Sequence, residues 1–284
     1  MIHELPLERR TLHGRWSRDH APVVTIDPGD SVRFETLAIW WSRPWGEPFD
    51  PPRAPDDGHA LTGPIAVRGA RAGATLSVRI DDVDPGPWGV TLTSEPHRVE
   101  WELGGGIGRS STGHTVKLAP FLGVIGMPPD EPGTHSTRPP RVSGGNIDCK
   151  ELVAGSTLYL PIPVDGALLS AGDAHALQGD GEVSGTAIET TSRAQLTVDL
   201  RDDLSLESPI ARVDGAWLTF GFDPDLDRAA DLALDGMLRL IQRQHDASHD
   251  DALALASVVV DLRVTQVVNE VKGVHAVLRD DAWS

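Results

Sequence analysis

Residues 172–189, GDAHALQGDGEVSGTAIE, combine four carboxylates and a histidine with four glycines. A Gly-Asp run of this kind is often no more than a solvated turn. Here, however, strand-like sequences flank it on both sides, LYLPIPVDGALLS at 158–170 and VSGTAIETT at 183–191. Buried strands on either side would limit how far the segment extends into solvent, which favours a functional site.

Hydrolysis of an amide or ester needs a nucleophile, a proton carrier and a group that polarises the carbonyl. Serine is a poor candidate for the nucleophile, because the sequence has no G-x-S-x-G elbow and no Gly-Gly-Ser-Ser core. Cys149 is followed by Lys150 and Glu151, but consecutive side chains point in different directions and do not converge on one atom. Cys149 is therefore interpreted as a small half-buried residue after a turn.

A metal-activated water is the remaining solution. Carboxylates mixed with imidazole suit a divalent ion, which lowers the pKa of bound water and leaves an unligated carboxylate as general base. Zinc is favoured, and calcium or manganese also fits oxygen-rich ligands. The candidate metal ligands are Glu35, His59, Asp148 and His175. The candidate catalytic residues are Asp173, Gln178, Asp180 and Glu182.

The glycines of the segment offer backbone access to a small ligand. Gly172, Gly179, Gly181 and Gly185 permit close approach, and their N–H groups are expected to stabilise an oxyanion. Gln178 adds an amide for a substrate carbonyl. Ordinary turns explain the same glycines, and a satisfied polar contact explains Gln178, so these alternatives stay open.

The elements that must position these residues are mostly strands. Glycines and prolines punctuate the first 220 residues, and three related phrases each predict a tight turn followed by a strand: PGDSVRFETL (28–37), AGATLSVRIDDV (72–83) and AGSTLYLPIPV (154–164). The Pro-rich segments 43–58 and 126–145 are expected to be ordered loops.

The pattern changes near residue 223. DPDLDRAADLALDGMLRLIQRQHD has apolar residues at helical spacing, an acidic first turn and a basic end. From an N-cap at Ser248, the stretch to 268 is expected to run as a second helix before a closing strand around VHAVLRD. The predicted fold is α+β, mainly β in sandwich- or barrel-like sheets, with a C-terminal helical pair packed on them. The expected division is a β-rich body with the active site, 1–222, and an integrated helical segment and strand, 223–284.

Net charge and composition limit the classes of partner and the compartment expected for this protein. A formal charge of −17 argues against nucleic acid and anionic membranes, which require a basic footprint. The N-terminus has no apolar signal region, and the sequence has no apolar run long enough to span a membrane. Together with a single cysteine, these features predict a cytoplasmic protein.

The stretch GGNIDCKELVAGSTLYLPIPVDGALLSAGDAHALQGDGEVSGTAIE resembles the central signature of the acetamidase/formamidase family, which is distinct from the Ser-Lys amidases. The resemblance extends, in family order, to PVVTIDPGDSVRFET, HALTGPIAVRGARAGATLSVRIDDV, PFLGVIGMPP, SVVVDLRVTQVVN and GVHAVL. It implies hydrolysis of short linear amides to ammonia and a carboxylate, a β-rich fold, a divalent metal and a homodimer or higher assembly. Carried over by position, the implied site comprises His59, Asp148, Asp173, His175, Gln178, Asp180 and Glu182.

One departure from the family pattern follows FET, where LAIWWSRPWG contains Trp40, Trp41 and Trp45. These residues are expected either to shape a larger or more apolar pocket or to form a subunit interface. Two alternatives to the amidase remain: a non-catalytic calcium-binding or structural protein on this scaffold, and a hydrolase of an ester or cyclic amide.

Overall fold

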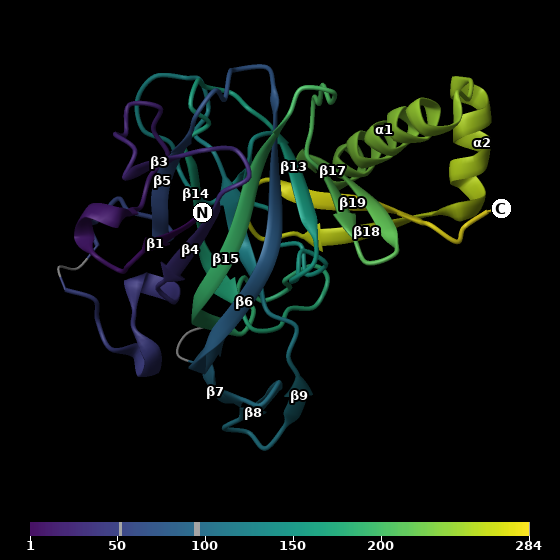
Figure 1. Cartoon of the computed structure of the whole chain (residues 1–284). Coiled ribbons are helices and arrows are strands. Elements are labelled where there is room, and N and C mark those ends of the chain that lie inside the picture. Colours follow the sequence, from purple (N-terminus) through teal and green to yellow (C-terminus); the bar gives the residue numbers. More distant parts are fainter. Residues whose placement is uncertain (51–52, 94–96, 284) are drawn as a thin grey trace.

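The computed structural model describes residues 1–50, 53–93 and 97–283, and its strands form one continuous hydrogen-bonded network. Figure 1 shows the long strands β6 and β15 side by side, with the two helices at the C-terminal end of the chain. The prediction of a mainly β, α+β fold is confirmed.

The first row of strands is centred on β15 and β6. Its order is β1 (Ile2–Leu5), β4 (Ser31–Thr36), β15 (Glu189–Arg201), β6 (Thr75–Leu92), β13 (Thr157–Pro161), β16 (Ile210–Val213), β17 (Ala216–Asp223), β19 (Lys272–Arg279) and β18 (Val260–Gln266). β7 (Arg98–Gly104), β8 (Ile107–Ser110) and β9 (Thr115–Lys117) continue antiparallel from the far end of β6.

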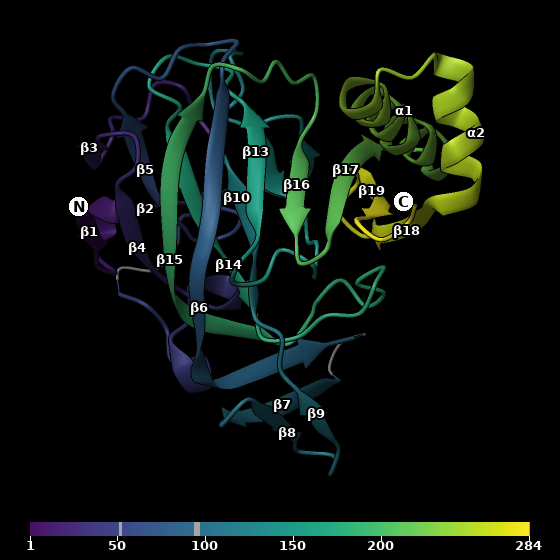
Figure 2. The ribbon, with the colours of Figure 1, turned by 45° about the vertical axis from the view of Figure 1, so that its right-hand side comes forward.

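A second row lies behind the first, as Figure 2 shows for β5, β14 and β10. It comprises β2 (Leu12–His13) and β3 (Val24–Ile26) beside β5 (Leu61–Val67), then β14 (Leu169–His175), β10 (Phe121–Gly126), β12 (Gly144–Asn146) and β11 (Pro140–Arg141). Three short 3₁₀ turns interrupt the loops: Arg9–Thr11, Ile39–Trp41 and Pro44–Gly46. The rows join where the end of β14 pairs with the start of β15.

One apolar core fills the space between the rows. It draws Phe34 from β4, Ile80 from β6 and Leu196 from β15, together with Leu122 from β10 and Leu169 from β14, all 1 % exposed or less. Alternation along each strand directs these side chains inward, as expected for packed sheets.

The three predicted turn-and-strand phrases are confirmed. Gly29, Gly73 and Gly155 each take a φ between 87° and 94°, and β4, β6 and β13 follow directly. Such a φ is the left-handed conformation that glycine adopts without steric cost. The Pro-rich segments 43–58 and 126–145 are mainly loops. The second segment includes β11 and the start of β12 near its end. Within the first, positions 51 and 52 lie outside the described residues.

The helical pair has the predicted caps. α1 (Leu226–His245) begins after Asp225, whose side chain accepts from the Arg228 N–H, and α2 (His249–Val259) begins after Ser248, which caps the Asp251 N–H. α1 packs on β17 and β19. The expectation that the second helix continues to residue 268 is wrong: β18 replaces it from Val260, in a stretch rich in β-branched side chains that favour a strand.

Candidate active site

The centre of the site is His175, the last residue of β14. It lies directly opposite Glu189, the first residue of β15, and its Nε2 is 3.3 Å from Glu189 Oε1. Asp173 precedes it by two residues and so shares its face of β14, with Oδ2 3.5 Å from the same Nε2. The junction of the two rows therefore brings one imidazole nitrogen against two carboxylates.

The other nitrogen of His175 has a fixed partner. His175 Nδ1 lies 2.9 Å from Gln178 Oε1, while Gln178 Nε2 donates to the Asp148 carbonyl at 2.7 Å. The second bond fixes the orientation of the amide, so Nδ1 is the nitrogen that donates to Oε1. Nε2 then faces Asp173 and Glu189: when protonated it donates to these carboxylates, and when deprotonated its lone pair can bind a cation between them.

Asp148 lies on the Nδ1 side of the His175 ring, and Glu182 lies near both residues. Asp148 Oδ1 is 4.0 Å from His175 Nδ1 and has no hydrogen-bond partner among the described residues. Its Oδ2 accepts from Asn269 Nδ2 at 2.6 Å. Asp148, His175 and Glu182 each present a ligand atom within 4.8 Å of the others, as do Asp173, His175 and Glu189. Two overlapping groups of potential metal ligands thus share His175.

Burial and mutual repulsion act on the acidic pair. Desolvation, with repulsion from neighbouring carboxylates, raises the pKa of Glu182 to about 7. The same causes raise the pKa of Asp148 well above its ordinary value. The Asp148–Glu182 pair therefore retains a proton near neutral pH, as two close carboxyl groups do when both cannot ionise.

Asp173 behaves in the opposite way. Although burial opposes ionisation, the neighbouring His59 and His175 lower the pKa of Asp173 to about 2. For His175, burial is outweighed by Glu189 and Asp173, which raise the pKa of the imidazole well above its usual range. The Nε2 side of the ring is thus a strongly negative pocket that favours a proton or a metal cation.

Gly123 forms the floor of this cluster. It lies on β10 between residues paired with β14, and a Cβ at this position would be 2.5 Å from Asp148 Oδ1 and 2.9 Å from Asp173 Oδ2. Only a residue without a side chain leaves both carboxylates in place.

Three acidic residues of the site have left-handed backbones. The φ angles are 54° at Asp148, 57° at Asp173 and 44° at Glu182. This conformation is uncommon for residues other than glycine, and such residues concentrate at functional sites.

A cavity of about 610 Å³ gives access to the cluster. His59, Asp173 and Asn269 line its inner end. Thr137 positions His59, since its Oγ1 accepts from the His59 backbone N–H at 2.9 Å and lies 3.0 Å from His59 Nδ1. His59 Nε2 is left facing Asp173 Oδ2 at 3.8 Å.

Most of the residues predicted for the site lie together. The structure brings together His59, Asp148, Asp173, His175, Gln178 and Glu182. Glu35 lies apart: it is exposed on β4 between inward-facing Phe34 and Thr36, and its Oε2 is near the Leu7 N–H. Asp180 also points away and forms an ion pair with Lys150 at 2.8 Å.

The expected oxyanion role of the glycines is not supported at two positions. The N–H groups of Gly181 and Gly185 donate to the carbonyls of Thr265 and Glu182, so neither is free to bind a substrate oxygen. Gly172 instead permits close packing, because a Cβ there would be 2.4 Å from the Ala60 carbonyl oxygen.

The surroundings of Cys149 do not suit a nucleophile. Cys149 is fully buried, with Sγ donating to Glu151 Oε2 at 3.3 Å, and burial next to that carboxylate raises the pKa of the thiol well above its ordinary value. Glu151 also lies 3.2 Å from Arg263 Nη1 and 3.5 Å from His275 Nε2. Cys149, Glu151 and His275 form a third group of potential metal ligands, but none of them lines the cavity.

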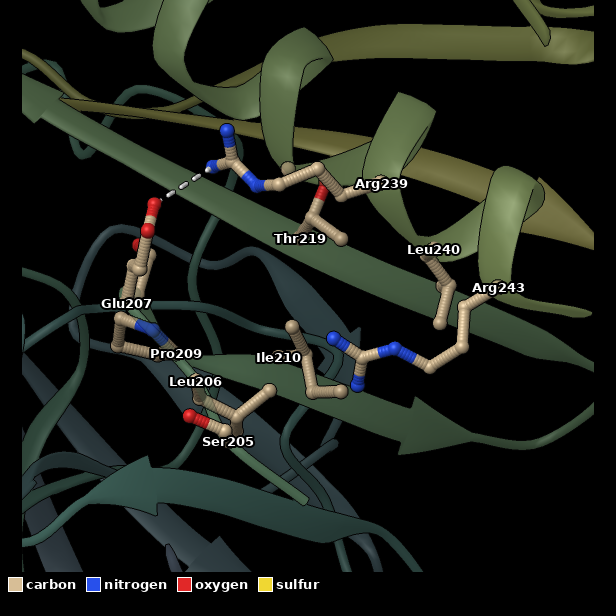
Figure 3. A pocket seen from close by; sticks show the side chains of 11 residues that line it. Ser205, Leu206, Glu207, Pro209, Ile210, Thr219, Arg239, Leu240 and Arg243 are labelled. Carbon is tan, nitrogen blue, oxygen red and sulfur yellow. Dashed lines mark ion pairs between the residues drawn. The ribbon is translucent and has the colours of Figure 1, made fainter. Parts of the chain in front are cut away.

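A second hollow, of about 140 Å³, lies under α1 (Figure 3). Arg239 points towards Glu207, at 3.8 Å, and Arg243 extends towards Ile210. Its lining has no histidine and no pair of carboxylates among the described residues, so it lacks the groups that hydrolysis requires.

Sequence reasoning missed Glu189, Asn269, Gly123 and Thr137. Glu189 is the last carboxylate of segment 172–189, and Asn269 ends the phrase SVVVDLRVTQVVN; only the strand register and the turn after β18 show that they reach the site. PFLGVIGMPP contained the one available signal, a glycine inside a strand, which often marks close approach of another group.

The sequence was compared with models of known protein families. The sequence model of the acetamidase/formamidase family matches residues 3–101 and 131–276. The chain belongs to the acetamidase/formamidase family. Both matched segments carry site residues, with His59 in the first and Asp148, His175 and Glu189 in the second.

Relatives within the acetamidase/formamidase family are distant in sequence and close in structure. An acetamidase of Mycolicibacterium smegmatis is 27% identical over 66% of this chain and 65% of its own length. A formamidase of Methylophilus methylotrophus is 28% identical over 68% of this chain and 64% of its own. The chain thus spans just under two thirds of each of these relatives. The crystal structure of a predicted acetamidase/formamidase from Thermoanaerobacter tengcongensis has a TM-score of 0.90 at 26% identity, covering 99% of this chain and 96% of that one.

Proposed function

We propose that this member of the acetamidase/formamidase family hydrolyses the carbon–nitrogen bond of linear amides, giving ammonia and a carboxylate through a metal-activated water. The observation that carries the proposal is the arrangement around His175: two groups of potential metal ligands share its imidazole, and Asp173 of one group lines an open cavity. Family membership adds support, since the relatives described above are named acetamidase and formamidase.

The donor set fits a divalent metal. Asp173 Oδ2, His175 Nε2 and Glu189 Oε1 are separated by 3.3 to 3.5 Å about the nitrogen, the spacing of ligand atoms around an ion bound at about 2.0 to 2.2 Å. The raised pKa of His175 marks a position where a proton is held between two carboxylates and where a cation can replace it. We assign Asp173, His175 and Glu189 as ligands, with His59 beside them; zinc is favoured over calcium or manganese because of the imidazole.

The bound metal would supply Lewis-acid polarisation and a water of lowered pKa. The chain's own residues divide the other tasks. Glu182, whose pKa is raised by burial in the metal-free protein, takes a proton from the attacking water and gives one to the leaving ammonia. Asp148 shares that proton, and Asn269 holds the Asp148 carboxylate in place.

Two residues orient the reactants. Gln178 fixes the tautomer of His175 through Nδ1. His59, held by Thr137, faces the cavity and can donate from Nε2 to the substrate oxygen. In this proposal His59 donates to the substrate oxygen, the role that the sequence had suggested for the backbone N–H groups of Gly181 and Gly185.

A non-catalytic calcium site is not favoured. Both potential ligand groups contain the His175 imidazole, whereas calcium selects oxygen ligands.

We further propose a homodimer or higher oligomer that acts in the cytoplasm. Support for self-association comes from exposed Val258 on α2 and Leu262 on β18, a strand that pairs along its length with β19 and on its other edge forms only an isolated bridge, from Gln266 to Gly181, among the described residues. A buried, unpaired Cys149 agrees with a reducing compartment. None of the described helices is long and apolar enough to cross a membrane.

The test is a screen for ammonia release from formamide, acetamide and propionamide, with metal content measured on the same purified protein by plasma mass spectrometry. We expect turnover that requires bound metal. A metal-loaded, folded protein that releases ammonia from no amide would contradict the proposal.

A further inference from the structure

The outer wall of the active-site cavity carries an exposed tryptophan. Trp40 is 59% exposed and lines the cavity with its neighbours Leu37, Ala38 and Ile39. His59 and Asp173 line the same cavity. One wall is therefore apolar and aromatic, and charged side chains line much of the rest of the cavity, among them Arg15, Arg53, Asp57, Arg138 and Glu270.

The backbone presents this indole in an unusual conformation. Trp40 has a φ of 55° and Trp41 a φ of 58°, in the left-handed region that bulky residues rarely adopt. A non-glycine residue held there costs free energy and persists only where its surroundings fix it. Backbone hydrogen bonds between Ala38 and Ser42, of 2.9 and 3.3 Å, close the loop around the two tryptophans.

Trp41 anchors the loop from the inside. It is 2% exposed, its Nε1 donates to the Gly58 carbonyl at 2.9 Å, and the Arg9 guanidinium lies 5.2 Å from its ring centre. The bond to Gly58 ties the loop to the residue preceding His59. The buried indole thus fixes the exposed one relative to the inner end of the cavity.

The size of the cavity exceeds what the smallest amides need. Its volume is about 610 Å³, whereas acetamide, with four non-hydrogen atoms, occupies at most about 120 Å³ if each atom takes up to about the 30 Å³ share of a water molecule. The cavity therefore has room for a substrate several times larger than acetamide.

We propose that the preferred substrates are arylalkyl amides, primary amides with an aromatic ring one or two carbons from the carbonyl, which stacks on Trp40. This inference rests on the proposed function. Hydrolysis is the same reaction: water adds to the carbonyl carbon, the carbon–nitrogen bond breaks, and ammonia leaves with the proton that water gives up. Aromatic pairing adds to the burial of apolar area, so the ring strengthens binding of both ground state and transition state.

The experiment compares kcat/KM for phenylacetamide and for acetamide in the parent protein and two variants. We expect phenylacetamide to be the better substrate of the parent. Trp40→Ala should lower the ratio of kcat/KM for phenylacetamide to kcat/KM for acetamide about 3- to 10-fold, through a higher KM for phenylacetamide. Trp40→Phe should retain most of the parent's ratio. Trp45→Ala is the matched control, because Trp45 is also an exposed tryptophan (57%) with a left-handed φ of 67° but does not line the cavity.

Each outcome has one meaning. Acetamide turnover with no preference for phenylacetamide, or a ratio equal in the parent and Trp40→Ala, would overturn the inference and leave the amidase proposal standing. An equal fall of the ratio in Trp45→Ala would also overturn it, because the effect would not be specific to the cavity wall. A parent protein that hydrolyses neither amide would overturn both proposals.

Discussion

His175 and Glu189 are direct register partners at the point where the two rows of strands join, with Nε2 of the imidazole 3.3 Å from Oε1 of the carboxylate. Directly opposed residues of an antiparallel pair extend to the same face. The pairing that joins the rows therefore also places the imidazole beside its carboxylate.

The first prediction concerns Glu189 as a metal ligand. Glu189→Gln removes the negative charge and should lower metal affinity at least about 10- to 100-fold, with a parallel loss of amidase activity. The fold should persist, because the amide oxygen can still accept the Ala187 N–H that now reaches Oε1 at 2.8 Å. Metal titration followed by calorimetry measures the affinity.

Glu35→Gln is the matched control for Glu189. It removes the same charge from the exposed face of β4, outside the cluster. Equal metal affinity in the Glu189 variant and the parent would reject the ligand assignment.

The second prediction concerns Glu182 in proton transfer. Glu182→Gln should lower kcat by about 10²- to 10⁴-fold, the usual contribution of general acid–base catalysis, without loss of bound metal. Steady-state ammonia release and metal content, measured together, test both parts. Asp180→Asn, which breaks only a partly exposed ion pair with Lys150, should change kcat less than twofold.

The third prediction uses the floor of the site. Gly123→Ala inserts a methyl group 2.5 Å from Asp148 Oδ1 and 3.1 Å from His175 Cε1, so the side chains must shift. Displacement of this size should cost about 100-fold in kcat/KM. Gly104→Ala meets open space on β7 and should have little effect on activity, so a similar loss in both variants would contradict the steric explanation.

The fourth prediction is that metal removal destabilises the protein as well as inactivating it. Dialysis against a chelator should abolish ammonia release and lower Tm, because a ligand present at 100 times its Kd stabilises the fold by about 2.7 kcal/mol. Separate re-addition of zinc, calcium or manganese, followed by calorimetry and activity, identifies the metal, and zinc should restore both. Full activity in the metal-free protein would exclude the metal-dependent reaction.

The fifth prediction concerns stability in acid and a residue outside the cluster. Burial, with repulsion from His20, lowers the pKa of His13 from 6.5 to about 4. The neutral ring fits its surroundings, with Nδ1 donating to the Arg15 carbonyl and Nε2 accepting from Ser170 Oγ. The unfolded chain binds the proton first, so stability falls as pH drops from 6.5 to about 4, by about 2 to 3 kcal/mol in all. In His13→Gln, the free energy of unfolding from urea titrations should fall less steeply over that window; an unchanged slope would rule out this contribution.

Local patterns predicted the elements and many of the site residues. The caps at Asp225 and Ser248, the turns at Gly29, Gly73 and Gly155, and the mainly β fold all follow from short-range chemistry that the sequence displays. Residue type and position at turns between strands indicate His59, Asp148, His175 and Glu182, the family resemblance implies the same four, and the structure brings them together.

Long-range geometry explains what the sequence did not reveal. Glu189 is one of many charged residues in strand-like segments, and only its register opposite His175 distinguishes it. Glu35 was included for its residue type, yet strict alternation with Val32, Phe34 and Thr36 assigns it to the outer face. The early end of α2 has a similar origin, because the pairing of β18 with β19 decides the structure of a β-branched stretch that local rules leave ambiguous.

The left-handed backbones of Asp148, Asp173 and Glu182 set stability against activity at the same three positions. Each costs about 1 to 2 kcal/mol relative to an ordinary conformation, a cost that glycine avoids. Selection for thermostability alone would therefore favour glycine at the positions where catalysis needs a carboxylate. Glycine substitutions recovered there in such a screen should give a more stable but inactive protein.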